Sequence, residues 1–150
     1  MDIKKLKTLR KETGVSLALC KKALEESSED LEKAKKLLQK WGAEVLTKKA
    51  ANITKEGAIF SYVHHNKKIA SLVEIVCQTD FVAKNEEFQK LGQEIAMQVA
   101  SIPTKTIEEL LNQEYIRDPS KKIIDLLNEA ALKFGENIKI SRFLRWQLGL

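Results

Sequence analysis

The spacing of apolar residues changes near Gly57, and this change constrains the fold more than any other feature of the sequence. Before it, apolar residues recur every three or four positions, which is typical of helices that bury one face. Gly14 and the pair Ser27-Ser28 interrupt this pattern. We therefore predict a three-helix domain over residues 1–50.

Beyond Gly57 the pattern indicates strands as well as helices. Residues 58–63 and 69–77 are rich in β-branched and aromatic side chains, and Asn66-Lys67 between them suits a tight turn. These two stretches predict a β-hairpin.

The remainder of the chain predicts helices followed by a final strand. Apolar and polar residues alternate over residues 136–150, apart from Arg142, which predicts a third strand. With a linker over residues 51–56, residues 57–150 are expected to form an α+β domain, a small antiparallel sheet packed with helices. Signals of helix starts and ends support the intervening helices: Asn85, Thr106, Asp118-Pro119 and Gly135.

Composition excludes several classes of protein. The chain has 2 prolines and 6 glycines among 150 residues, and 43% of its residues are hydrophobic, unlike disordered or collagen-like chains. No apolar run approaches the ~18 residues of a membrane-spanning helix, and the charged start shows no secretory signal. Its 2 cysteines cannot form a disulfide framework, so we expect a cytoplasmic protein with no membrane partner.

No catalytic constellation is visible in the sequence. The glycines are isolated, so there is no phosphate-binding loop. His64 and His65 are adjacent in a predicted strand, where their side chains would point to opposite faces and could not share a metal ion. Cys20 and Cys77 fit buried positions for small hydrophobic residues, although the residues alone leave a Cys–His pair open. We expect a protein that is not an enzyme and needs no metal or cofactor of its own.

The positive charge is concentrated in the predicted helical domain. The net charge is +6 over residues 1–55 and −1 over residues 56–150. A basic domain raises nucleic acid as a partner. Interleaved acidic residues, without an aromatic stacking platform, favour instead helices with solvated, lysine-rich faces. A basic RNA- or ribosome-binding module stays open as an alternative function.

One predicted connection is unusual because it contains large apolar residues. Residues 78–85 read Gln-Thr-Asp-Phe-Val-Ala-Lys-Asn and lie between a predicted strand and a predicted helix. Packing considerations favour a Phe81 that folds back to fill the core under the helix. In the alternative, Phe81 points outward as an anchor for a partner, and Asp80 pairs with or displaces a charged group there.

Three groups of residues, taken together, are specific enough to indicate a family. The central group is the segment 78–85. The others are Leu9-Arg10-Lys11-Glu12-Thr13-Gly14-Val15-Ser16 with Cys20-Lys21-Lys22-Ala23-Leu24, and Ile116-Arg117-Asp118-Pro119-Ser120-Lys121 with Gly135-Glu136-Asn137-Ile138 and Arg142-Phe143. In this order, and over most of the chain, they resemble the elongation factor Ts family of bacterial and organellar translation.

The resemblance implies a fold, a partner and an activity. The first domain would be similar to ubiquitin-associated (UBA-like) domains, and an α+β core would follow. The partner would be elongation factor Tu, in its GDP-bound and nucleotide-free states. The activity would be guanine nucleotide exchange in protein biosynthesis, by release of GDP without covalent chemistry. Direct contact with nucleic acid is not expected.

The resemblance also implies which residues contact the partner. Thr79, Asp80, Phe81 and Val82 would enter elongation factor Tu near its magnesium and phosphate site. Phe81 would wedge between helices of the nucleotide-binding domain, and Asp80 and its neighbours would disturb the magnesium coordination. The N-terminal domain would grip another helix of the same domain, through the matching positions Arg10, Leu17 and Ala18.

The chain is short compared with long members of the family. Only about 10 residues, from Pro103 to Asn112, separate the predicted core helix from the C-terminal motif. A protruding coiled coil and much of the core would therefore be absent. A small sheet would then leave an edge and a face uncovered, so we predict that two copies pair as a homodimer.

Overall fold

A computed structural model describes all residues, 1–150, and the chain forms two compact units. The first unit comprises residues 1–51 and 127–137, and the second comprises residues 52–126 and 138–150. The sequence-based division places residues 127–137 in the C-terminal domain instead. None of the helices is both long enough and apolar enough to cross a membrane.

The first unit is built on three helices, as the apolar spacing predicts. Each begins after a side chain that accepts backbone N–H bonds, namely Asp2, Ser16 or Asp30. The first helix ends at Gly14, whose φ of 70° is the left-handed conformation that favours glycine. The helices are α1 (Ile3–Thr13), α2 (Leu17–Glu26) and α3 (Leu31–Lys48).

The C-terminal part of α7 (Ile123–Phe134) completes the first unit. Leu132 packs against the apolar core that the three N-terminal helices form. At Gly42 of α3, an added Cβ would lie 2.0 Å from the backbone oxygen of Asn128, so the two helices approach each other closely at a glycine. Burial of the apolar face of α7 explains why this segment joins residues far away in sequence.

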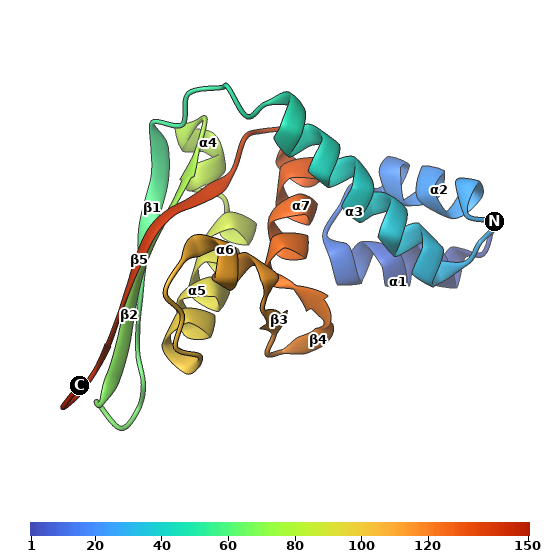
Figure 1. The fold of residues 1–150 in the computed structure, drawn as a ribbon. Helices are drawn as coiled ribbons and strands as arrows, with labels where there is room; N and C mark the ends of the chain where they lie inside the picture. The colour runs from blue at the N-terminus through green and yellow to red at the C-terminus, as the bar shows by residue number, and fades with distance from the viewer. The chain divides into compact units, whose positions relative to one another are not determined.

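An antiparallel three-stranded sheet with the order β1-β2-β5 forms the second unit, as predicted. Helix α5 (Glu86–Ser101) covers one face of this sheet (Figure 1). On that face the Phe60 and Phe88 rings lie 5.9 Å apart. An added Cβ at Gly92 would lie 2.2 Å from the Phe60 ring, so the glycine makes room for it. The strands are β1 (Glu56–Val63), β2 (Ile69–Cys77) and β5 (Lys139–Gln147).

A β-bulge at Ser141 exchanges the two faces of β5. The register between β2 and β5 shifts at this point, which leaves Ser141 without a paired residue in β2. Ile140, before the bulge, is buried, whereas Leu144 and Trp146, beyond it, are exposed. The apolar alternation that predicted one inward face of this strand is therefore divided between the two faces of the sheet.

The connection between α5 and α7 holds a short helix and a two-stranded hairpin. Asp118-Pro119, which sequence predicts as a helix start, lies instead in a strand. The Asp118 carboxylate accepts the N–H and the hydroxyl of Ser120, and this local turn replaces a helix cap. Helix α7 starts only after Lys122, whose N–H donates to the Asp125 carboxylate at 2.8 Å. The elements are α6 (Ile107–Asn112), β3 (Glu114–Tyr115) and β4 (Asp118–Lys122).

Gln98 of α5 holds this connection in place. Its buried Nε2 donates to the carbonyl oxygen of Glu114 at 3.0 Å, and its Oε1 accepts the N–H of Ile116 at 3.0 Å. Beside it, the Tyr115 hydroxyl donates to the Glu94 carboxylate at 2.8 Å. Burial, together with this carboxylate, raises the pKa of Tyr115. Hydrogen bonds to Gln98 and Glu94 of α5 thus hold the connection between α5 and α7 in place.

The two adjacent histidines depart from the prediction. Strand β1 ends at Val63, so His64 and His65 lie in the turn, and their ring centroids are 4.2 Å apart rather than on opposite faces. The Tyr62 hydroxyl and His64 Nδ1 share a hydrogen bond of 3.1 Å. No group of three or more His, Cys, Asp and Glu side chains is arranged to hold a metal ion.

Candidate partner-binding site

The segment with the unusual apolar residues folds as a four-residue helix, α4 (Asp80–Ala83), directly after β2. Thr79 Oγ1 accepts the N–H of Val82 at 3.3 Å and caps this helix. Cys77 Sγ donates to the carbonyl oxygen of Thr79 at 3.3 Å, which ties the cap to the end of β2. Val82 and Ala83 are buried and seat the helix on β1, β2 and α5.

Phe81 points away from this support, and 78% of its surface is exposed. The packing expectation, that Phe81 folds back under the helix, is wrong. Successive side chains of a helix point about 100° apart, so burying Val82 turns Phe81 outward. Phe88 of α5, in contrast, is fully buried and packs against Phe60.

Asp80 precedes Phe81 in α4, and its side chain is exposed as well. Its Oδ2 lies 3.6 Å from Lys84 Nζ, and both side chains are largely exposed, so the ion pair is weak and open to exchange. The structure thus brings the predicted Thr79, Asp80 and Phe81 to one surface. Val82 differs from them, because its side chain supports this surface from beneath.

A second candidate surface, here called the α1–α2 corner, consists of Arg10, Leu17 and Ala18. All three side chains are exposed and flank the turn between α1 and α2. Val15 and Cys20 are fully buried beneath them. Burial raises the pKa of the Cys20 thiol above its ordinary value of 9.0. Cys20 therefore serves as a packed apolar group.

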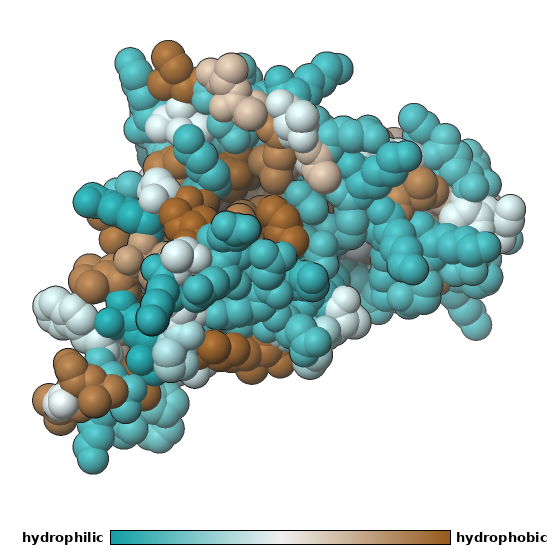
Figure 2. Space-filling model, viewed as in Figure 1, coloured by the Kyte–Doolittle hydropathy of each residue, from teal (hydrophilic) through white to brown (hydrophobic).

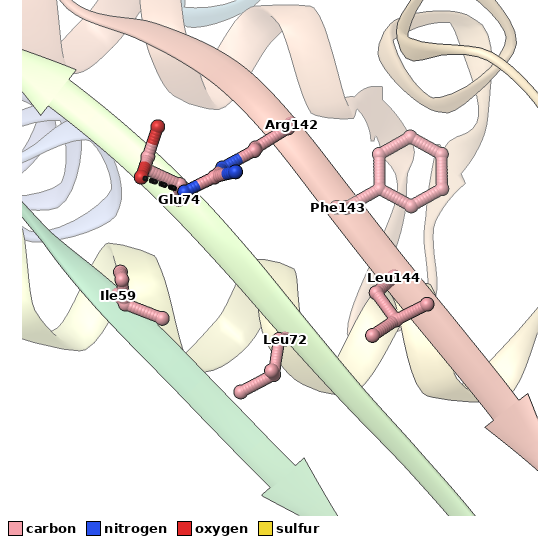
Figure 3. A pocket seen from close by; sticks show the side chains of 6 residues that line it. All are labelled: Ile59, Leu72, Glu74, Arg142, Phe143 and Leu144. Carbon is pink, nitrogen blue, oxygen red and sulfur yellow. Dashed lines mark hydrogen bonds and ion pairs between the residues drawn. The ribbon is translucent and has the colours of Figure 1, made fainter.

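The sheet face opposite α5, here called the outer sheet face, carries exposed apolar side chains. Ile59, Leu72 and Leu144 come from three neighbouring strands and line a shallow groove of about 270 Å³ (Figure 3). Trp146 follows on β5 and is 70% exposed. In Figure 2 apolar side chains gather at the lower left, at the end of the sheet that carries the C-terminus.

One ion pair accompanies the apolar residues of the outer sheet face. Arg142 Nη2 donates to Glu74 Oε2 at 3.2 Å (Figure 3). The hydroxyl of Ser141, the bulge residue, donates to Glu74 Oε1 at 2.6 Å. This hydrogen bond, and then the guanidinium of Arg142, lower the pKa of Glu74. The bulge therefore supplies a polar contact as well as the change of face.

Sequence reasoning predicted an uncovered face but not the residues that form it. A signal was present, because residues of both parities in the two hairpin strands are apolar, for example Ile59 beside Phe60. Such strands are typical of sheets that are covered on both faces.

The fold defines a class of protein, a small α+β protein that presents a protruding aromatic segment. Residues 78–148 match the family model described as Elongation factor TS, and residues 1–44 match the one described as Elongation factor Ts, mitochondrial, N-terminal. The first match begins at Gln78, directly before the capped helix. The chain belongs to the elongation factor Ts family, and its role is therefore in translation elongation, a part of protein biosynthesis.

Relatives named Elongation factor Ts match almost the whole chain. The protein from Thermotoga neapolitana is 40% identical over 192 positions, which cover 99% of this chain and 96% of the relative. The protein from Thermosipho melanesiensis is 39% identical over 194 positions, with 99% of both chains covered. Because the first alignment has 192 positions and this chain 150 residues, the relative contains internal residues that this chain lacks.

Proposed function

We propose that the chain is a guanine nucleotide exchange factor that binds elongation factor Tu–GDP and promotes the release of GDP. The carrying observation is a phenylalanine, Phe81, that is 78% exposed in a member of the elongation factor Ts family. Its helix is capped by Thr79 and anchored by the buried Val82 and Ala83, so the backbone holds the ring in an exposed position. Such a ring, with few rotatable bonds, suits an interface anchor.

In this proposal Phe81 inserts between helices of the partner's nucleotide-binding domain. Asp80 then brings a negative charge toward the magnesium and phosphate site of elongation factor Tu. The magnesium there neutralises phosphate charge, so a disturbed coordination weakens the hold on GDP. Thr79 and Val82 contribute by fixing the helix that carries Phe81 and Asp80.

Exchange follows from thermodynamic coupling. The factor must bind nucleotide-free elongation factor Tu more tightly than the GDP-bound form, and GDP binding is then weakened by the same factor. Each 1.4 kcal/mol of coupling is about a tenfold change in nucleotide affinity. Binding of GTP weakens binding of the factor by the same coupling, so GTP displaces the factor from elongation factor Tu. The proposed compartment is the cytoplasm, where such a partner works.

The α1–α2 corner is proposed as a second contact with the same nucleotide-binding domain. Leu17 offers an exposed apolar side chain and Arg10 a positive charge, and the buried Val15 supports them. The net charge of +6 over residues 1–55 would then face a protein surface rather than RNA.

The decisive experiment measures release of a fluorescent GDP analogue from elongation factor Tu. The wild-type chain is expected to accelerate release, and Phe81→Ala to lose most of the acceleration. Leu150→Ala is the control, because Leu150 is 95% exposed at the end of the chain. No acceleration by the wild type would refute the exchange function. Salt-sensitive RNA binding in its place would support the RNA-binding alternative.

We also propose that two copies associate through the outer sheet face. Its apolar side chains lie on three adjacent strands, and two such faces can bury one another in an isologous contact. Sedimentation velocity should show a dimer for the wild type and a monomer for Leu72→Glu, which places a charge in the centre of the face. A 17.0 kDa species of the wild type at high concentration would refute this assembly.

A further inference from the structure

Gln89 of α5 donates a side-chain hydrogen bond to the backbone of α4. Its Nε2 lies 2.7 Å from the carbonyl oxygen of Ala83, and this contact is partly buried. Ala83 is the last residue of α4, and α5 begins at Glu86. Side chains of a helix lean toward its N-terminus, so a residue in the first turn of α5 can reach back to α4. Gln89 thereby connects the two helices.

Helix α4 depends on such contacts because it is short. Two backbone hydrogen bonds hold its single turn: the N–H of Ala83 donates to the carbonyl of Thr79 at 3.2 Å, and that of Lys84 to the carbonyl of Asp80 at 3.0 Å. The last carbonyl groups of a helix have no partner within the helix. Gln89 supplies the partner for the carbonyl of Ala83.

The direction of the Phe81 ring is set by the backbone of α4. The ring is 78% exposed, so packing against neighbouring side chains does little to orient it. Val82 anchors the helix on the core, and only Lys84 and Asn85 separate α4 from α5. The hydrogen bond from Gln89 spans this connection and restrains the angle between the two helices. It therefore also restrains the direction in which Phe81 points.

We propose that Gln89 is a positioning residue for nucleotide exchange, which holds α4 in the orientation that aims Phe81 at elongation factor Tu. This inference rests on the proposed exchange function and adds a residue that acts through Phe81. A group that is already held in its binding orientation loses less conformational freedom on binding. Without the restraint, α4 occupies that orientation for a smaller fraction of the time, and productive binding falls by the same fraction.

Two substitutions remove the hydrogen bond in different ways. Gln89→Glu keeps the shape of the side chain but replaces the donor with an acceptor, and Gln89→Ala removes the donor without adding charge. The measurement is the rate of GDP release from elongation factor Tu against the concentration of factor. Both variants should lower the initial slope by about fivefold, the ratio that one net hydrogen bond supports.

The same titration contains a rescue and a matched control. Gln89→Lys brings a donor that can reach the same carbonyl group, and it should recover at least about half of the wild-type slope. Gln93→Glu makes the same change of charge at an exposed glutamine one turn further along α5. It should keep the wild-type slope.

Hydrogen exchange of the free chain, followed by nuclear magnetic resonance, tests the restraint without the partner. In Gln89→Ala, exchange should speed up at the amides of Ala83 and Lys84. The amide of Ile95, in the middle of α5, should exchange as in the wild type, and the midpoint of urea unfolding should not move. A residue that only stabilised the fold would change these last two quantities as well.

The outcomes separate the two proposals. If Phe81→Ala is impaired while Gln89→Ala and Gln89→Glu keep the slope of Gln93→Glu, the role of Gln89 is refuted and the exchange function stands. Unchanged exchange at Ala83 and Lys84, or no recovery in Gln89→Lys, also overturns the assignment. If the wild type does not accelerate release at all, the exchange function fails, and the role of Gln89 fails with it.

Discussion

The α1–α2 corner and the α4 segment both present exposed side chains, but they are held in place by different kinds of contact. At the corner, the glycine cap at Gly14 and the Ser16 cap lie next to the residues that they position. The α4 segment depends on Val82 and on contacts with three other elements, namely the preceding strand β2, the following helix α5 and the more distant strand β1. A surface built locally survives changes elsewhere, whereas one built on tertiary contacts depends on the core beneath it.

The largest expected change in stability tests the core beneath the α4 segment, and it is expected for a substitution at Gly92 of α5. An added Cβ would lie 2.2 Å from the Phe60 ring, so Gly92→Ala should displace the ring and lower the free energy of unfolding by about 3 kcal/mol. Phe60→Leu in the same chain should restore part of this loss, because the obstacle is a side chain. Urea unfolding followed by circular dichroism measures both, and Lys90→Ala on the same helix is the control.

The location of the Gly92→Ala effect can be checked with Trp41, which lies in the first unit. In a Trp146→Phe background, Trp41 is the remaining tryptophan of the chain. Its unfolding transition should move less than the transition of the second unit. If Gly92→Ala shifted the unfolding transitions of both units equally, the first unit would depend on the core of the second, and the comparison would fail.

A smaller effect is expected when the support of α4 is compared with the residue that it presents. Val82→Ala removes buried methyl groups and should lower the free energy of unfolding by about 2 kcal/mol. Phe81→Ala should change it by less than about 0.5 kcal/mol, because the ring is exposed. Thermal unfolding measures the two variants, and the order should reverse in the GDP-release assay. A large loss of stability in Phe81→Ala would mean that the ring is part of the core.

The two helix caps sharpen the comparison further. Ser16→Ala and Thr79→Ala each remove a side-chain acceptor and should lower stability by about 1 kcal/mol. The ten-residue α2 keeps its other contacts, whereas the four-residue α4 has few hydrogen bonds of its own. Hydrogen exchange should therefore speed up more at the Val82 amide in Thr79→Ala than at the Leu19 amide in Ser16→Ala. Equal changes would contradict the stronger dependence of α4 on its cap.

The smallest effect concerns the buried thiol beneath the α1–α2 corner. The pKa of Cys20 is raised by burial, so the unfolded chain loses this proton first as the pH rises. The contribution is fully present below the ordinary pKa of 9.0, and stability should fall as the pH rises from there through the raised pKa. Cys20→Ala should remove that part of the pH dependence, measured by urea unfolding between pH 7 and about 10. An unchanged alkaline profile would contradict the burial argument.

Several predictions from sequence held because their causes are local. The start of α5 after Asn85 and the end of α7 at Gly135 follow from capping chemistry within a few residues. The two-cysteine pattern also predicted burial correctly, since both thiols are inaccessible. Composition alone indicates the segment 78–85, because large apolar residues are unusual in a connection.

Other predictions failed because competing local signals do not reveal which conformation the chain adopts. Asp118-Pro119 has the residues of a helix start, but the turn at Ser120 places it in a hairpin strand. His64 and His65 were assigned to a strand that ends one residue earlier, so their rings meet instead of diverging. The direction of Phe81 could not be read from residue type, because a phenylalanine is equally suited to a core or an interface.

By itself, the sequence determined the three N-terminal helices, the hairpin, the final strand and the segment that carries Phe81, because periodicity, caps and residue types act over a few positions. Only the tertiary structure decided that residues 127–137 join the N-terminal helices and that Ser141 exchanges the faces of β5. It also decided that Val82 is buried while Phe81 is exposed. These outcomes depend on which apolar surfaces bury one another across long stretches of chain, and local sequence patterns do not encode that choice.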